Sequence, residues 1–353
     1  MSGRIYTIEE RETWEEWYDR LDTGPYHSPT YLETLAGEFE HDSERAELFV
    51  YGDSDSFVYY PYIRRDLTDL PFVGEVFSDP ESCSDIVSSW YYGGPLLSEG
   101  ASPSLADEFA EEFTEYCGDA GIVSEFIRFD PNRGNHNRFD ALEPTFNRET
   151  VNVDLTKEID TLWNEFEKRN RNAIRQAQQT DLVVEPTTDS TDFEAFYDIY
   201  TNAMEAKDAS DHYRFPFSFF TTLFETDLAT VIIARYDSEV VGGAVVVHDD
   251  HIAHDYLRAS NPDYWDFRVN NLLCYGAMME MRDRGIDRFD FQGGRPGVFK
   301  FKKGFSTVGR SEFYIGKQIH CPEVYDSLTE AAADTGIDTN TGYFPAYREA
   351  KSN

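Results

Sequence analysis

The spacing of apolar and polar residues in the first half of the chain predicts a mixture of amphipathic helices and short strands. Residues 8–21 place Trp14, Trp17 and Tyr18 on one helical face, and a Thr7…Glu10 capping box precedes them. Apolar runs of strand length, rich in Val, Tyr and Phe, follow. The pattern predicts helices at 8–21, 31–39 and 102–118, and strands at 46–51, 57–64, 72–77 and 122–129.

The second half repeats this order of elements. It predicts strands at 150–155, 181–185, 229–236, 240–247, 251–258, 286–292 and 311–319, and helices at 157–178, 192–207, 216–226, 269–284 and from Pro322. Each half reads as helices, a meander of strands, a Gly-rich break, a helix and a strand. This order favours a mixed α/β (α+β) fold with two related domains. We expect these at 1–148 and 149–335, with a C-terminal tail at 336–353.

The composition and net charge indicate the kind of solvent to which the protein is adapted. The 353 residues are 40% hydrophobic and 15% aromatic, which is enough for real cores and excludes a disordered acidic tail protein. The net charge is −36, and the eight lysines all lie at or beyond Lys157. An acidic, Lys-poor surface is typical of a protein that stays soluble in concentrated salt. We favour this halophilic interpretation over an ordinary acidic cytosolic protein.

The sequence offers no signal for export, membrane insertion or a metal. The N-terminus lacks an apolar signal segment, and runs such as 241–247 fall short of the roughly 20 residues that a span needs. We therefore expect a cytoplasmic protein without a transmembrane segment, as a monomer or weak dimer. Cysteines 83, 117, 274 and 321 are scattered and predict buried packing. The histidines of 248–254 lie in a predicted hairpin that puts His248 and His251 at the turn, and we expect ordinary turn residues there rather than a metal site.

Two basic islands interrupt the acidic background. Residues 168–175 hold four bases and no acid, and residues 295–305 hold Lys300, Lys302 and Lys303, three of the eight lysines. For the first island, two interpretations are about equally favoured: its bases pair with nearby carboxylates, or they bind a ligand. The second favours a ligand that carries phosphate or carboxylate. At ~1 M salt the Debye length is about 3 Å, so only direct contacts count. We expect a local phosphate site and no extended nucleic acid.

Several catalytic signatures are missing. The sequence contains no G-x-S-x-G elbow, no phosphate-binding G-x-x-x-x-G-K-[ST] and no G-x-G-x-x-G. Serine hydrolase, nucleotide hydrolase and dinucleotide-binding functions therefore lack their signals.

A set of ordered motifs resembles the Fem-type (FemA/FemB/FemX) transferases and their relatives in the GNAT acyltransferase superfamily. Residues 289–294 (FDFQGG) and 301–306 (FKKGFS) resemble the family's "DFxGG" strand end and "FKxxF" element. Earlier segments fit in the same order: YYGGP at 91–95, FIRF at 126–129, RNRNAIRQA at 169–177, YLRAS at 256–260 and NLL at 271–273. Individually each motif is weak, but their order and spacing, from about 90 to 325, make the resemblance specific.

The resemblance implies two tandem GNAT-like domains, each a twisted mixed sheet flanked by helices. It implies transfer of an acyl or aminoacyl group to an amine by direct attack of that amine, without a protein nucleophile. The donor would be aminoacyl-tRNA, bound by its acceptor end, or acyl-CoA. The acceptor would be a small molecule or a glycan or peptide precursor in cell envelope or polysaccharide biosynthesis.

By motif position, the resemblance also assigns roles to residues. Lys302 would contact a phosphate of the donor or acceptor, and Asp290 would accept a proton or cap the turn at the end of its strand. Tyr256 would donate to the leaving group or pack, and we favour packing. The remaining substrate-binding positions implied by the motifs are Tyr92, Gly93, Gly94, Arg128, Arg171, Arg175, Asn271, Gly293, Gly294, Lys300 and Lys303.

One departure affects the donor. Residues 258–271 lack the R-x-x-G-x-G/A loop that cradles the CoA pyrophosphate in ordinary GNAT enzymes. The leading hypothesis is an acyl- or aminoacyltransferase acting on an envelope precursor. Its alternatives are a CoA-dependent N-acetyltransferase of an amino sugar and a catalytically silent GNAT-like binding scaffold.

Overall fold

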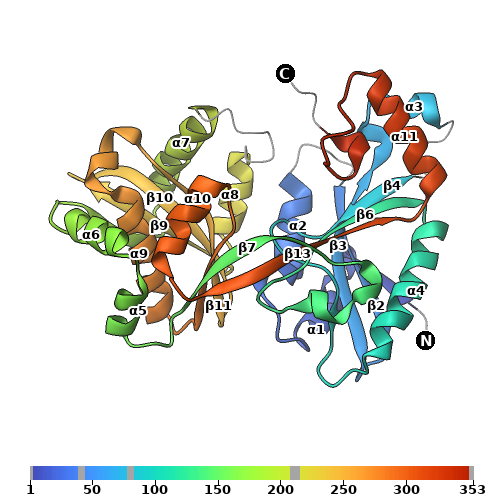
Figure 1. Ribbon diagram of the computed structural model, residues 1–353, viewed down its shortest axis with the longest axis horizontal. Coiled ribbons are helices and arrows are strands. Elements are labelled where there is room, and N and C mark those ends of the chain that lie inside the picture. The colour runs from blue at the N-terminus through green and yellow to red at the C-terminus, as the bar shows by residue number, and fades with distance from the viewer. Residues whose placement is uncertain (1–2, 39–43, 78–82, 207–214, 350–353) are drawn as a thin grey trace. The chain divides into compact units, whose positions relative to one another are not determined.

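The computed structural model describes residues 3–38, 44–77, 83–206 and 215–349. The chain forms two compact units (Figure 1). Unit 1 comprises residues 1–147 and 312–353, and unit 2 comprises residues 148–311. The chain leaves unit 1 along β7 (Thr145–Asp154) and returns along β13 (Arg310–Ile319).

Unit 1 is built on a mixed sheet whose strand order is β1-β2-β3-β4-β6-β13. All neighbours are antiparallel except β4 and β6, which are parallel. The strands not yet bounded are β1 (Gly3–Thr7), β2 (Glu44–Gly52), β3 (Phe57–Asp66), β4 (Ser84–Val87), β6 (Ile122–Arg128) and β5 (Leu96–Leu97), which pairs with β3. The helices are α1 (Arg11–Tyr18), α2 (Pro29–Glu38), α3 (Val73–Val76), α4 (Ser104–Asp119) and α11 (Pro322–Asp334).

Unit 2 has a second mixed sheet with the order β8-β9-β10-β11-β12-β7. Its parallel pair is β11 and β12, and its other neighbours are antiparallel. The strands are β8 (Val183–Thr187), β9 (Ala229–Tyr236), β10 (Glu239–His248), β11 (Ile252–Ser260) and β12 (Arg288–Gln292). The helices are α5 (Ile159–Glu165), α6 (Lys168–Ala177), α7 (Ser190–Ala206), α8 (Phe217–Phe224), α9 (Val269–Asp283) and α10 (Pro296–Lys302).

The two sheets share one topology. Each runs through three antiparallel pairs, one parallel pair and a final antiparallel pair. Each parallel pair is joined through a helix, α4 in unit 1 and α9 in unit 2, as parallel pairing requires a crossover. This confirms the predicted mixed α/β class with two related halves.

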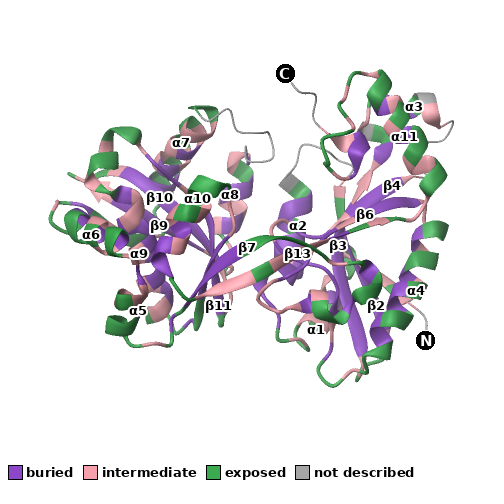
Figure 2. Ribbon diagram, viewed as in Figure 1, coloured by how far each residue is buried: buried purple, intermediate pink, exposed green. Residues whose placement is uncertain are grey.

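The cores differ in composition. In unit 1, α4 packs Phe109 and Phe113 on the sheet, where Phe113 lies 4.9 Å from Phe49 and 5.1 Å from Tyr60 between ring centroids. In unit 2, α9 buries aliphatic and sulfur-containing side chains such as Leu273 and Met278. Figure 2 shows buried strands within each unit and exposed outer faces of the helices. Burial of such apolar surface is the main source of stability for each unit.

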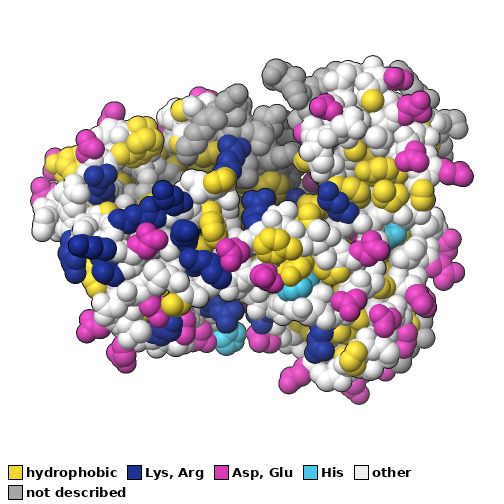
Figure 3. Space-filling view, viewed as in Figure 1, with side chains coloured by type: hydrophobic (Ala, Val, Ile, Leu, Met, Phe, Trp, Pro, Cys, Tyr) yellow, Lys and Arg dark blue, Asp and Glu magenta, His cyan; other side chains and the backbone are white. Residues whose placement is uncertain are grey.

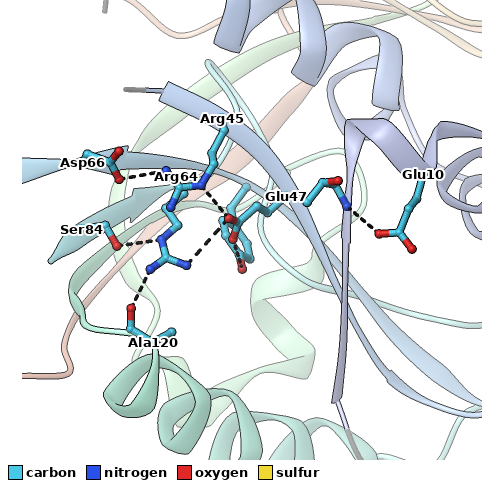
Figure 4. Close-up of polar contacts among 9 residues, drawn as sticks. Glu10, Arg45, Glu47, Arg64, Asp66, Ser84 and Ala120 are labelled. Atoms are coloured by element: carbon cyan, nitrogen blue, oxygen red, sulfur yellow. Dashed lines mark hydrogen bonds and ion pairs between the residues drawn. The ribbon is translucent and has the colours of Figure 1, made fainter. Parts of the chain in front are cut away.

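A buried acid in unit 1 is neutralised within its own sheet (Figure 4). The side chain of Glu47 on β2 is 6% exposed and pairs with Arg45 at 3.0 Å and Arg64 at 3.8 Å. Tyr62 donates its hydroxyl to the same carboxylate at 3.1 Å. Buried acids of this kind need such partners, and we assign the cluster to the fold rather than to chemistry.

Three local predictions were wrong. Residues 72–77, predicted as a strand, contain the short helix α3, and the N-terminal helix is preceded by the unpredicted strand β1. The predicted helix at 157–178 is divided into α5 and α6 at Phe166 and Glu167, which are extended (ψ 143° and 145°). A tertiary contact causes the division, because the Glu167 N–H donates to the Gly304 carbonyl at 2.8 Å.

The structure also divides the chain differently from the boundary expected at residue 335. Residues 312–335 and the described part of the tail belong to unit 1. The tail is anchored there by Arg348, whose Nε lies 2.6 Å from the fully buried carboxylate of Asp85. Tyr347 is also fully buried and hydrogen bonds with Ser124 at 2.8 Å. Side-chain anchors of this kind have no periodic signal in sequence.

Candidate functional site

The candidate site in unit 2 lies where β11 and β12 part. Their parallel pairing runs from Ile252↔Arg288 to His254↔Asp290 and goes no further. Beyond that point β11 continues along β10 as far as Ser260, and β12 continues along β7 as far as Gln292. The backbone edges of the two strands therefore diverge, and we call this place the fork.

A β-bulge stands at the fork. On β11, Asp255 and Leu257 face consecutive residues of β10, Val246 and Val245, so Tyr256 is the extra residue. Tyr256 is buried, and its ring stacks on Phe219 of α8 at 6.2 Å between centroids. The favoured packing role of Tyr256 agrees with this position.

Beside the bulge, one buried carboxylate meets two cations. Asp255 Oδ1 lies 3.1 Å from Arg258 Nη1, and Asp255 Oδ2 lies 3.7 Å from Lys302 Nζ of α10. Arg258 also contacts the Cys274 thiol of α9. Burial lowers the pKa of Lys302, while the Asp255 charge opposes that shift.

Asp290 is the second buried acid at the fork and is fully inaccessible. Its Oδ1 accepts the Gln292 N–H at 2.6 Å, and its Oδ2 lies 3.3 Å from His254 Nδ1. Gln292 has a positive φ of 61°, so this hydrogen bond holds the turn that leads into Gly293 and Gly294. The turn-capping geometry considered for Asp290 is therefore present.

A cavity of about 400 Å³ opens past the end of β12. Its lining residues are Arg148, Glu149, Gly294, Pro296, Phe299, Lys300 and Lys303. Three of these are cations and one is an acid, in a chain whose net charge is −36. Unit 2 holds 19 of the 31 Lys and Arg residues, and Figure 3 shows many of them on one face of it. Such a cavity suits a phosphate-bearing or carboxylate-bearing ligand.

The three clustered lysines thus face different surroundings. Lys300 and Lys303 line the cavity, whereas Lys302 lies inside the unit beside Asp255. Consecutive residues of α10 point to different sides of the helix, which accounts for the division. The structure accordingly places Lys300 and Lys303, rather than Lys302, where a phosphate could be met.

Two arginines of the first basic island, residues 168–175, already contact other groups of unit 2. Arg171 donates to the carbonyls of Phe166 and Asn164, the latter at 3.2 Å, and so covers the C-terminal end of α5. The Arg175 guanidinium lies 5.1 Å from the centre of the Trp163 ring.

Asn271, another predicted substrate-binding residue, lies in the first turn of α9, where its N–H donates to the Arg268 carbonyl at 3.0 Å.

In unit 1 the structure brings Tyr92, Gly93, Gly94 and Arg128 together. The Gly93 N–H donates to the Arg128 carbonyl at 2.7 Å, and Asn135 Nδ2 donates to the Gly93 carbonyl at 2.9 Å. Gly94 has a φ of +81°, which favours glycine.

The side chains of this unit 1 group lie among aromatic rings. Arg128 stands over Phe126 at 4.7 Å, and Tyr92 is buried against Tyr26 at 5.7 Å between centroids. The motif therefore forms a rigid, buried turn.

Sequence reasoning missed four residues of unit 2: His254, Asp255, Arg258 and Arg148. His254 lies inside β11, within the strand predicted at 251–258, but the sequence did not indicate its contact with Asp290. The signal for Asp255 and Arg258 was their position within the YLRAS motif region, next to its tyrosine. Arg148 falls at the crossing between the two units, where periodicity gives no indication.

Two features are absent from the described ranges, a metal-binding cluster and a membrane-spanning helix. No group of three or more His, Cys, Asp or Glu residues there is arranged to hold a metal ion. No helix in those ranges has the length and apolar character to cross a membrane.

Comparison with known proteins identifies the second unit. Residues 164–303 match the acetyltransferase (GNAT) domain family. No curated protein matches the chain significantly by sequence.

Solved structures resemble the whole chain. FemX aligns with a TM-score of 0.67 at 14% identity, covering 92% of this chain and 99% of FemX. A tandem GNAT protein from the clavulanic acid biosynthesis pathway aligns with a TM-score of 0.51 at 12% identity, over 90% and 98%. The C-terminal domain of a protein assigned as lysylphosphatidylglycerol synthetase from Agrobacterium fabrum aligns with a TM-score of 0.55 at 13% identity, over 94% and 96%. These likenesses confirm the expected tandem GNAT fold.

Proposed function

We propose that the chain transfers an acyl or aminoacyl group to an amine of a cell envelope glycan or peptide precursor. The match of residues 164–303 to the acetyltransferase (GNAT) domain family and the tandem fold shared with FemX support this proposal. The observation that carries the proposal is that a basic cavity opens next to the fork, just past the end of β12. The fork offers backbone groups and buried charge to a reacting carbonyl. The cavity offers Lys300, Lys303 and Arg148 to the phosphate of a substrate.

The reaction that suits this arrangement needs no protein nucleophile. The acceptor nitrogen attacks the acyl carbon, a C–N bond forms, and the carbonyl oxygen becomes an oxyanion. The C–O bond of an aminoacyl ester or the C–S bond of a thioester then breaks, the amine loses a proton, and the leaving oxygen or sulfur gains one. Lys302 would supply positive charge to the oxyanion or a proton to the leaving group. Asp290, with His254, would take up the amine proton.

The acceptor side of the proposal rests on unit 1. By the motif resemblance, Tyr92, Gly93, Gly94 and Arg128 of this unit would contact the acceptor. The resemblance of the ordered motifs to the Fem-type transferases favours an acceptor of the peptide or glycan precursor type.

A specific observation favours a second donor. The matching domain family is named for acetyl transfer, which makes acetyl-CoA a candidate beside aminoacyl-tRNA. Thermal unfolding with each donor, in buffers of low and multimolar KCl, separates the two, because a bound donor raises the midpoint by mass action. Mass spectrometry of ligands that copurify in high salt would identify the acceptor.

Substitution tests the assignment. Lys302→Ala should abolish transfer while the chain remains folded, and Lys300→Ala with Lys303→Ala should weaken donor binding. Each lost charge-assisted contact costs about 1.5–3 kcal/mol, or roughly 10- to 150-fold in affinity. Lys317→Ala, an exposed lysine in unit 1, is the matched control. Full transfer activity in the Lys302→Ala variant would contradict the proposed role of Lys302 and, with it, the proposed reaction.

A further inference from the structure

Asp255 occupies a position that a regular strand would not give it. Residues three apart on a strand point to opposite faces of the sheet. Asp255 and Arg258 are three apart on β11, yet their side chains are 3.1 Å apart. The bulge at Tyr256 inserts one residue between them and brings both to one face. Asp255 is also the first residue of β11 beyond its last pair with β12.

The carboxylate of Asp255 is divided between two cations. One oxygen is 3.1 Å from Arg258 and the other is 3.7 Å from Lys302, and all three side chains are at most 11% exposed. The other nearby acid, Asp290, already accepts the Gln292 N–H at 2.6 Å and faces His254. Asp255 is therefore the carboxylate within ion-pair distance of Lys302 among the described residues.

We propose that Asp255 is a positioning residue whose shared carboxylate holds the Lys302 ammonium at the fork. Its use in catalysis rests on the proposed function, but its effect on Lys302 does not. Asp255 does not touch the reacting atoms; it acts through the lysine. Burial opposes a charge on Lys302, and Arg258 opposes it as well, whereas Asp255 gives the largest of the opposing effects, ahead of Asp290 and Cys274.

The groups that face Lys302 define what a pH titration would report. They are Asp255 and Arg258 on β11, Asp290 on β12 and Cys274 on α9. Arg258 stays charged, and burial raises the pKa of the Cys274 thiol to about 12. Asp255→Asn removes the negative charge with little change of shape. The Lys302 ammonium should then lose its proton at lower pH.

The test follows the ammonium directly by NMR of lysine labelled with ¹³C at Cε, with Lys302→Arg to identify its signal among eight lysines. In Asp255→Asn the titration midpoint of Lys302 should fall by about 1 pH unit or more, the usual effect of losing an opposite charge within about 4–6 Å. Asp250→Asn, at the exposed hairpin turn, should leave the midpoint unchanged. An unchanged midpoint in folded Asp255→Asn overturns the proposal.

Thermal unfolding covers the case in which Asp255→Asn folds poorly. The substitution should lower the unfolding midpoint less in a Lys302→Met background than in the natural chain. In that background there is no buried Lys302 ammonium to lose its carboxylate partner. An equal loss in both backgrounds overturns the proposal.

The pH profile of transfer separates this inference from the proposed function. Its alkaline limb should move to lower pH together with the NMR midpoint. If the midpoint moves and the limb does not, Asp255 positions the lysine and the proposed role of Lys302 in transfer fails.

Discussion

His27 gives unit 1 a measurable sensitivity to acid. Its side chain is fully buried below the Gly93–Gly94 turn. Burial lowers the pKa of His27 from 6.5 to about 4. Asp130 opposes this shift by raising the pKa, and Arg133 adds to it by lowering the pKa, each with a smaller effect than burial. The perturbation we consider is His27→Gln, which keeps a polar side chain at this position but cannot titrate.

The sign follows from proton linkage. Between pH 4 and pH 6.5 the unfolded chain binds a proton at His27 that the folded chain does not, so acid favours unfolding over this range. The stability contribution is intact above the unfolded pKa of 6.5 and is lost as the pH falls toward 4. At pH 4.5 the loss amounts to about 2.5 kcal/mol for a difference of this size between the two pKa values.

The assay is urea unfolding of the natural chain and of His27→Gln at pH 7.5 and pH 4.5, in the same salt. Each protein serves as its own reference, so the quantity compared is the change in unfolding free energy between the two pH values. Burial also lowers the pKa values of His136 and His248, but both remain in the variant and cancel. We expect the variant to lose about 2.5 kcal/mol less than the natural chain. Equal losses in the two proteins would refute the reasoning.

Two further substitutions test packing and the position of the tail. Gly243→Ala would place a Cβ 2.5 Å from the Phe196 ring and should cost about 1–3 kcal/mol in thermal or urea unfolding, whereas Gly297→Ala, with open space around it, should cost nothing. Arg348→Ala should cost about 3 kcal/mol, because it leaves the buried Asp85 carboxylate with one of its two arginines. A loss below 0.5 kcal/mol would show that the tail is not anchored to unit 1 through this pair.

The sequence was a good guide to strands and helices with an apolar period and a clear stop. The hairpin of β10 and β11 and the end of α9 at Gly285, with a φ of +87°, follow the predicted pattern. Local periodicity could not find the division of α5 from α6, since the Gly304 carbonyl that causes it is over a hundred residues away. The anchoring of Arg348 on Asp85 is equally remote in sequence.

The candidate site shows a different reason for partial prediction. Charge clustering pointed to the segment 295–305, and Lys300 and Lys303 of that segment line the basic cavity. It could not tell Lys302 from its neighbours, because Lys300 and Lys302 face different sides of α10 and Lys303 lies just past the end of that helix.

The bulge at Tyr256 explains how Asp255 and Arg258 come to lie on the same face of the sheet. Reading β11 as a regular strand would put Asp255 and Arg258 on opposite faces, one of them without a partner in the interior. One inserted residue turns this conflict into an ion pair and leaves the second carboxylate oxygen for Lys302. The bulge lies just past His254, the last residue of β11 that pairs with β12, so the opening of the sheet and the gathering of charge occur at one place. For this reason the fork is the place in unit 2 where we expect chemistry.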